Sequence, residues 1–190
     1  MTAPSRRRFL QLGLLGGAGL AVAGLAARVT GGYQLAPGEV PIGLDVRGMH
    51  VVRALCEALL PEEDGMPSAV ALGVPQRIDE EVWSSERWLA EDLRSAITLV
   101  ELAPLWKGGG ARLTRLSPEA RLAAFERLLR GSSNLVANAA SALRQMIYLY
   151  YYADSRVWPA IGYEGPFVQT PRPPASSLAY QAVRAARRRA

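Results

Sequence analysis

Residues 117–152, SPEARLAAFERLLRGSSNLVANAASALRQMIYLYYY, contain one whole helix with its boundaries and then a second, longer helix. Ser117, Pro118 and Glu119 are typical of a helix start: serine caps free N–H groups, proline fits the first turn, and an acid favours the positive end of the helix dipole. Gly131 is a typical helix end, and Ser132 or Ser133 starts the next helix, predicted to be the longest in the chain. The apolar residues with helical spacing are Leu122, Phe125 and Leu129, then Leu135, Val136, Ala139, Leu143, Met146, Ile147 and Tyr150.

The same spacing extends upstream of this stretch. It predicts a helix that ends at Pro61, a short helix that starts at Pro75, and a third helix that ends before the glycines 108–110. Their core-facing residues are Val52, Leu55, Cys56, Leu59 and Leu60, then Ile78 and Val82, then Leu89, Leu93, Ile97 and Val100. No convincing pair of strands accompanies these helices. The prediction is an all-α domain over residues 48–167, a small bundle of four to five helices.

Both flanks of this domain differ from it in composition. Residues 29–47 are predicted to be a linker, because prolines and glycines interrupt their alternating apolar residues. An extended arm lying on the domain is favoured there over a sheet strand. Residues 168–190 are a Pro-rich and then Arg-rich tail, for which two interpretations remain open. It is either a last short helix capped by Ser176 or Ser177, or a frayed and solvated end.

The composition excludes several classes of function. The chain has 190 residues with 22 Lys and Arg, 17 Asp and Glu, one His and one Cys. One His and one Cys exclude an intrachain disulfide, a Cys-rich zinc or iron–sulfur site and a metal site built on several histidines. The basic excess lies at the ends, where four arginines precede residue 29 and four more follow residue 183. Because a nucleic-acid-binding domain carries its basic residues on the folded face, no nucleic-acid partner is predicted.

Residues 1–28 have the layout of an export signal, with arginines followed by an uncharged stretch that runs to residue 27. The residues expected to be recognised are Arg6, Arg7, Phe9 and Leu10. The arginine pair resembles a twin-arginine signal, which directs folded proteins to the Tat translocase. The alternative is a plain membrane anchor, because residues 9–27 would span about 28 Å as a helix. Either interpretation places the folded part on the periplasmic side of the cytoplasmic membrane, released or still held by an uncleaved signal helix.

No combination of polar residues predicts an active site. His50 and Cys56 point about 240° apart on a helix and cannot share a ligand, and Cys56 fits the core. The acidic residues 62–64 and 79–81 lack the spacing of a calcium loop, and we expect them to be solvated. The glycines 108–110 lack the strand and the lysine of a phosphate-binding loop. The sequence therefore predicts a chain without a cofactor or metal of its own, and not an enzyme by itself.

Residues 148–167 are rich in aromatic side chains, with five Tyr, one Trp and one Phe. Three consecutive tyrosines point around a helix, so not all of them can be core. Prolines and glycines then break the helix and predict a loop that leaves the bundle. Two interpretations remain open: an aromatic lid that closes the bundle, or an anchor for a protein partner. The residues expected to contact a partner are Tyr151, Tyr152, Trp158, Tyr163 and Phe167.

The order of residues in this segment also resembles a known family. Residues 151–166, YYADSRVWPAIGYEGP, are similar to the C-terminal signature of the gluconate 2-dehydrogenase subunit 3 family. Residues 55–61, LCEALLP, and 71–79, ALGVPQRID, resemble the opening helices of that family and the loop between them. A Tat signal ahead of the domain fits the same resemblance.

The resemblance implies a non-catalytic accessory subunit. Such a subunit binds and matures an FAD-dependent dehydrogenase of the sugar, alcohol or gluconate type, often together with a cytochrome subunit that carries haem c. The small subunit bears the Tat signal and carries the flavoprotein, which lacks one, across the membrane. The alternative function is a stand-alone, membrane-anchored helical binding protein of the periplasm with no enzyme partner.

Overall fold

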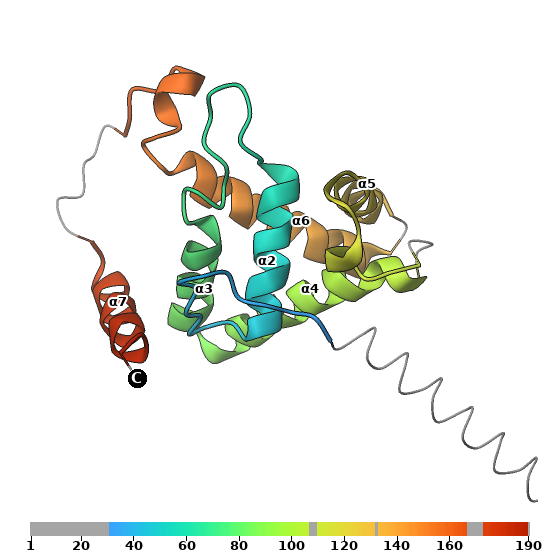
Figure 1. The fold of residues 1–190 in the computed structure, drawn as a ribbon, viewed down its shortest axis with the longest axis horizontal. Coiled ribbons are helices and arrows are strands. Elements are labelled where there is room, and N and C mark those ends of the chain that lie inside the picture. The colour runs from blue at the N-terminus through green and yellow to red at the C-terminus, as the bar shows by residue number, and fades with distance from the viewer. Residues whose placement is uncertain (1–30, 107–109, 132, 167–172, 190) are drawn as a thin grey trace, which may run out of the picture. The chain divides into compact units, whose positions relative to one another are not determined.

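The computed structural model describes residues 31–106, 110–131, 133–166 and 173–189, and the regular elements in these ranges are helices joined by loops (Figure 1). The predicted signal residues Arg6, Arg7, Phe9 and Leu10 lie outside these ranges. No β-strand occurs among the described residues, so the all-α fold class is confirmed. None of the described helices combines the length and the hydrophobicity that crossing a lipid bilayer requires.

The bundle is built from the helices that the sequence predicts. They are α2 (Val46–Leu59), α3 (Val74–Ser84), α4 (Arg87–Trp106), α5 (Pro118–Leu129) and α6 (Asn134–Tyr152), with a 3-10 turn η1 (Leu113–Arg115) before α5. Ser117 caps α5 as predicted, because its Oγ accepts a hydrogen bond from the Ala120 N–H at 3.3 Å. The prediction that α6 is the longest helix is wrong by a small margin, since α4 has 20 residues and α6 has 19.

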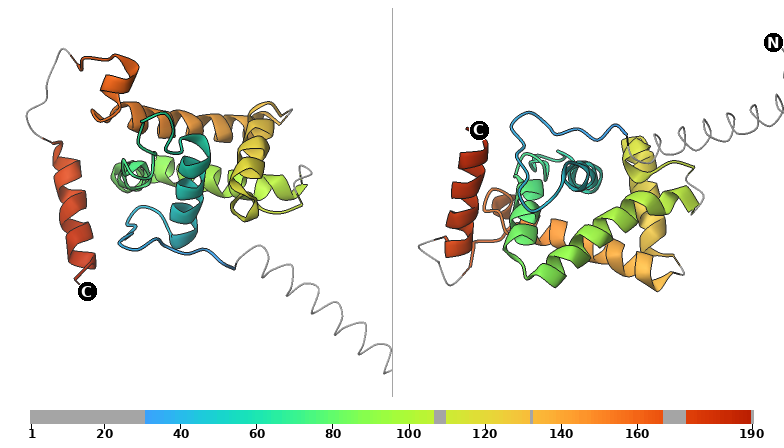
Figure 2. Two further views of the ribbon diagram at one scale, coloured as in Figure 1. Left: turned by 45° about the horizontal axis from the view of Figure 1, so that its top comes forward. Right: turned by 90° about the horizontal axis from the view of Figure 1, so that it is seen from below.

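α6 contacts three of the other helices, α3, α4 and α5, while α2 packs against α3, α4 and α5 from its own side (Figures 1 and 2). The largest apolar side chains enclosed between these helices are Met49, Leu55, Ile78, Phe125, Leu143 and Ile147. Burial of each such side chain contributes roughly 2 kcal/mol relative to exposure. The hydrophobic faces of α2 to α6 therefore hold the bundle together.

The buried face of α5 is rotated from the prediction. Leu122 and Leu129 are only half-buried. The residues that face the core are Arg121, Ala124, Phe125 and Leu128. Arg121 reaches inward because its guanidinium donates hydrogen bonds to three backbone carbonyls, those of Ala54 at 3.1 Å, Leu116 at 3.2 Å and Thr114 at 3.5 Å. A pattern of apolar residues alone does not predict this arginine.

The seam of α6 also differs from the prediction at both ends. Leu135 is 71% exposed, although it was expected to face the core. At the other end the buried tyrosine is Tyr151, and Tyr150 is half-buried. The Tyr150 hydroxyl instead donates a hydrogen bond to Glu81 Oε2 at 2.7 Å, which ties α6 to α3. The residue that faces the core at this end of α6 is therefore Tyr151, one position after the predicted one.

A buried carboxylate organises the arm that precedes α2. Asp79 of α3 was predicted to be solvated, but it is fully buried. Its two oxygens accept N–H hydrogen bonds from Ile42 at 2.8 Å, Gly43 at 3.0 Å and Leu44 at 2.7 Å. A Cβ on Gly43 would lie 2.3 Å from the Asp79 carbonyl oxygen, so only glycine allows the arm to pass this close to α3. The backbone donors replace the water that the carboxylate loses.

The last described element is the helix α7 (Ala175–Arg187), which packs against α3 (Figure 1). Of the two interpretations of the tail, the helix is the one found, but the predicted cap is wrong, because the helix begins at Ala175 after Pro174 and both Ser176 and Ser177 lie inside it. Its contacts with α3 include one ring contact, between Tyr180 and Trp83 with centroids 5.8 Å apart, and two hydrogen bonds. The Tyr180 hydroxyl donates a hydrogen bond to Asp79 Oδ2 at 2.7 Å, and the Ser177 hydroxyl donates one to Glu80. Asp79 thus joins the arm, α3 and α7 at one point.

Candidate partner-binding site

The aromatic segment after α6 is shaped by its prolines and glycines. α6 ends at Tyr152, and a 3-10 turn, η2 (Trp158–Ile161), follows after a short loop. Gly165 lies at φ 110°, a backbone conformation that side chains disfavour, and a Cβ there would lie 3.0 Å from the Trp158 ring. The chain therefore folds back over the tryptophan instead of leaving the bundle as an extended loop.

An ion pair ties this segment to the loop before α3. The Arg156 guanidinium contacts both oxygens of Asp154, at 2.9 and 2.8 Å, and donates a third hydrogen bond to the Leu72 carbonyl at 3.2 Å. The hydrogen bond from Arg156 holds the pKa of the Asp154 carboxyl below its ordinary value. Next to this pair, the Tyr151 hydroxyl donates to the Pro67 carbonyl at 3.0 Å. Two independent contacts thus fix the aromatic end of α6 to the loop between α2 and α3.

The exposed aromatic residues form an open groove, which we call the aromatic groove. It is lined by Arg144, Gln145, Tyr148, Leu149, Tyr152, Ala153, Trp158, Tyr163 and Pro166. The rings of Trp158 and Tyr163 meet edge to face with their centroids 5.2 Å apart. The indole N–H of Trp158 donates to the Tyr152 carbonyl at 2.9 Å, which fixes the ring in place. The groove is apolar, rigidly supported and bordered by a basic residue.

The predicted contact residues have different fates. Tyr152, Trp158 and Tyr163 line the aromatic groove, and Tyr163 is 47% exposed. Tyr151 is the correction: it is only 1% exposed, because its ring fills the core between α6 and the loop at Pro67. Phe167 lies outside the described residues. The segment is therefore partly a lid, through Tyr151 and the buried Val157, and partly an open surface.

Of the residues that α6 contributes to the groove, the sequence predicts only Tyr152 as a contact residue. Tyr148, Leu149 and Tyr152 follow the helical spacing i, i+1 and i+4, so they share one side of α6 that is not the core side. The sequence analysis does not predict Leu149 as a surface residue, although it is among the most exposed leucines described. The signal that could have revealed the contribution of α6 to the groove is a second apolar side on this helix, in addition to the side that faces the core.

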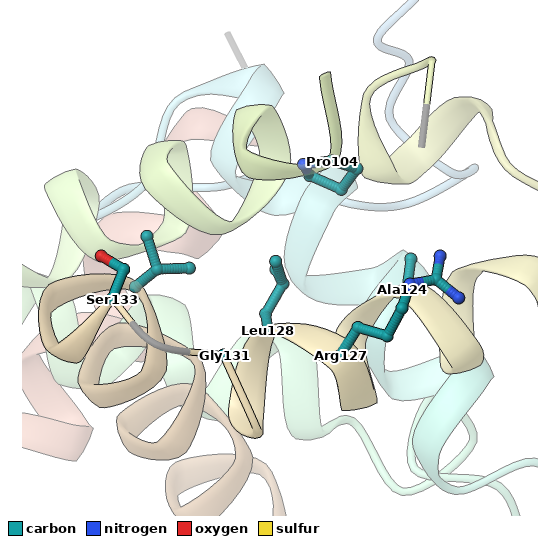
Figure 3. A pocket seen from close by; sticks show the side chains of 7 residues that line it. Pro104, Ala124, Arg127, Leu128, Gly131 and Ser133 are labelled. Carbon is teal, nitrogen blue, oxygen red and sulfur yellow. The ribbon is translucent and has the colours of Figure 1, made fainter. Parts of the chain in front are cut away.

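Two further surface features are apolar. Figure 3 shows a small hollow where Leu128 of α5 faces Pro104 of α4, near the start of α6. Arg127 borders it, and its other lining groups include neither an acid nor a histidine. The second feature is the outer side of α4, where Trp88 and Trp106 are both exposed. Neither feature offers a set of groups that could carry out a reaction.

The polar candidates from the sequence also have structural roles. His50 Nδ1 lies 2.9 Å from the Gln34 carbonyl oxygen and 3.1 Å from the guanidinium of Arg53. Cys56 is fully buried, and burial raises the pKa of its thiol far above the ordinary value, which keeps it protonated and unreactive. Within the described ranges, no three His, Cys, Asp or Glu side chains are arranged to hold a metal ion.

The fold and the groove define a class of protein, a small helical domain whose most developed surface is apolar and suited to contact with another protein. The comparison with protein families agrees with this class. The model described as gluconate 2-dehydrogenase subunit 3 matches residues 47–165, which is more than half of the chain. The chain therefore belongs to the gluconate 2-dehydrogenase subunit 3 family, the accessory subunits of a dehydrogenase complex. Searches among curated proteins and among solved structures find no match.

Proposed function

We propose that this chain is the non-catalytic accessory subunit of a periplasmic dehydrogenase complex, and that it captures an FAD-dependent catalytic subunit and carries it through the Tat route. The single observation that supports this most is the aromatic groove. It is built largely from the last residues of the family match, and exposed Trp and Tyr side chains are the residues that most often anchor protein partners.

The division of labour is the one that membership of this family implies. The flavoprotein would hold the FAD and oxidise the sugar, alcohol or gluconate-type substrate, and a cytochrome c subunit would accept the electrons. The small subunit would supply the export signal and a rigid docking surface. Export of a folded pair is the physical reason for a Tat signal on a chain without a cofactor motif, because a flavoprotein has to fold around its FAD before it leaves the cytoplasm.

The test is the location of the flavoprotein in cells that carry or lack this chain. The full-length chain is tagged, purified from its own membranes, and its eluate is examined for flavin absorbance and for the protein that carries it. Deletion of the chain is expected to leave that flavoprotein in the cytoplasm. An eluate without a flavoprotein supports the stand-alone binding protein instead and contradicts the proposal.

The export step has its own variant. Arg6→Lys together with Arg7→Lys keeps the charge but removes the planar guanidinium groups, which lysine does not imitate. We expect this chain and the flavoprotein to remain in the cytoplasm together. The matched control is Arg87→Lys with Arg130→Lys, two exposed arginines of the bundle, which should leave export unchanged. Undiminished periplasmic protein from the signal variant would contradict the Tat assignment.

A further inference from the structure

α7 packs on the bundle with a different side from the one that an ordinary surface helix buries. A helix of a globular protein normally buries its apolar side and exposes its polar side. In α7 the residues turned toward α3 are Ser177, Tyr180 and Arg184, which recur at i, i+3 and i+7. The first two are buried and hydrogen-bonded, and Arg184 is half-buried. The docking side of this helix is therefore its polar side.

The apolar side of α7 faces solvent as a consequence. Leu178 is 53% exposed and lies with several alanines on the side opposite Tyr180, whereas Val183, which follows Tyr180 by three residues, lies at the edge of this side and is 38% exposed. The helix is strongly amphipathic, so this arrangement is a property of its sequence and not of a single side chain. The outward residues are Ala175, Leu178, Ala179, Ala182, Val183 and Ala186.

The charge of the same segment indicates which kind of surface binds the apolar side of α7. Residues 173–189 contain four arginines and no acid. Arg187 donates to the Pro41 carbonyl at 3.0 Å and Arg188 to the Gly38 carbonyl at 2.7 Å, which holds the basic end of α7 beside the arm. A guanidinium carries five N–H donors, so one bond to a carbonyl does not exhaust it. A basic, amphipathic helix with an exposed apolar side matches an anionic surface that is apolar beneath its charges.

We propose that α7 is a lipid-contact helix that lies on an anionic phospholipid surface, with Leu178 and Val183 at the headgroup boundary and the terminal arginines on the phosphates. The modest size of its apolar residues favours a lipid surface over a protein pocket, because shallow insertion assisted by basic side chains does not require a large anchor. Stable attachment usually takes two such signals, and the uncharged residues 9–27 are the candidate for the other. The proposal concerns a different surface from the aromatic groove and holds whether or not a flavoprotein binds there.

The test places a fluorescent probe on each side of α7 in the full-length chain. Cys56 is fully buried, so a cysteine introduced at the surface is the one that takes a thiol-reactive probe. Ala182→Cys puts the probe on the outward side, and Gln181→Cys puts it one residue away on the polar half. Both proteins are reconstituted into vesicles of phosphatidylcholine with or without phosphatidylglycerol. The uncharged N-terminal stretch is present in every sample, so it cannot account for a difference between the two probe positions.

In vesicles that contain phosphatidylglycerol, the fluorescence of the probe at 182 is expected to shift to the blue and to be quenched by nitroxide lipids. Both effects should disappear at high salt. The probe at 181 should stay in a water-like environment. Leu178→Gln with Val183→Gln leaves the bonds of Ser177 and Tyr180 intact and should abolish most of the shift. Replacement of Arg187, Arg188 and Arg189 by Gln should weaken binding to these vesicles about a hundredfold. The same three changes at Arg87, Arg127 and Arg130, which remove equal charge elsewhere, should not.

Three outcomes would overturn the proposal. The first is equal behaviour of the probes at 182 and 181, since that shows no lipid-facing side. The second is a shift of equal size without phosphatidylglycerol, since that removes the role of the arginines. The third is a shift at 182 that appears only when a flavoprotein is added without lipid, since that assigns the apolar side of α7 to a protein partner.

Discussion

α6 and α7 are both amphipathic helices, and they pack in opposite senses. α6 buries Leu143 and Ile147 among three neighbouring helices, and the exposed apolar residues of its last turns line one groove. α7 buries Ser177 and Tyr180 against one helix and exposes its apolar side. The first helix is held by buried apolar area, and the second by the ring contact of Tyr180 with Trp83 and by hydrogen bonds to Asp79 and Glu80. The difference indicates that α6 is part of the folding core, whereas α7 is an attachment whose docking can change without unfolding the bundle.

The largest effect is expected from truncation in the core side of α6. Leu143→Ala removes a fully buried side chain and leaves a cavity, so the free energy of unfolding should fall by about 3 kcal/mol. Leu149→Ala is the same change on the exposed side of the same helix and should cost less than about 0.5 kcal/mol. Denaturant unfolding followed by circular dichroism measures both. Equal losses would mean that the two sides of α6 are not distinguished as described.

Asp79→Asn should have the next largest effect. The two carboxylate oxygens accept three backbone N–H groups and the Tyr180 hydroxyl, and an amide replaces one of those oxygens with a donor. Leaving buried donors without an acceptor should cost about 2 kcal/mol and loosen both the arm and α7. Asp92→Asn, on the exposed side of α4, is the control and should be neutral. Hydrogen exchange that slows or stays constant in α7 would contradict the role given to Asp79.

Tyr180→Phe sharpens the comparison with the smallest change. It removes the hydrogen bond from the Tyr180 hydroxyl to Asp79 and should lower the local free energy of opening of α7 by about 1 kcal/mol. The amides of α7 should therefore exchange faster, while those of the bundle are unaffected. Tyr150→Phe, which removes the bond to Glu81 in the bundle, is the control and should leave α7 exchange unchanged.

The same residue predicts a pH dependence of α7 docking. Burial, together with the hydrogen bond to Asp79, raises the pKa of the Tyr180 hydroxyl above its ordinary value of 10.0. Because the folded pKa is the higher one, the docking free energy is fully present below about pH 10 and is lost as the pH rises above it. Exchange in α7 should therefore accelerate above that pH in the wild type, and less so in Tyr180→Phe. Identical profiles in the two proteins would contradict this assignment.

Much of the bundle could be predicted because apolar spacing, caps and breakers agree in it. Ser117, Pro75 and the stripe at Leu55 all lie where the pattern places them. Asp79 could not be predicted, because its burial depends on backbone donors that arrive from more than thirty residues away. A run of three acidic residues is ordinarily solvated. The residues next to Asp79 in the sequence do not indicate that the arm encloses this one of the three.

The candidate site was predictable in part for the same reason. The aromatic run marked the right end of the bundle, and Trp158 and Tyr163 are in the groove. The choice of Tyr151 as a surface residue was wrong, because a one-residue rotation of α6 exchanges core and surface, and three consecutive tyrosines give no signal that fixes this rotation. The docking sense of α7 also contradicts its own hydrophobic pattern, so only tertiary contacts reveal it.

The most direct test of the central claim is the affinity of the full-length chain for its co-purifying flavoprotein, measured for Trp158→Ala and Tyr163→Ala. If the aromatic groove is the docking site, each variant keeps its helical content and binds at least about tenfold more weakly, which corresponds to about 1.4 kcal/mol. Trp88→Ala removes a tryptophan of α4 that is 64% exposed and lies outside the groove, and this variant should bind like the wild type. Wild-type affinity in Trp158→Ala and Tyr163→Ala, or a loss of binding that only follows a loss of helical structure, would contradict the account and leave the aromatic segment as a lid.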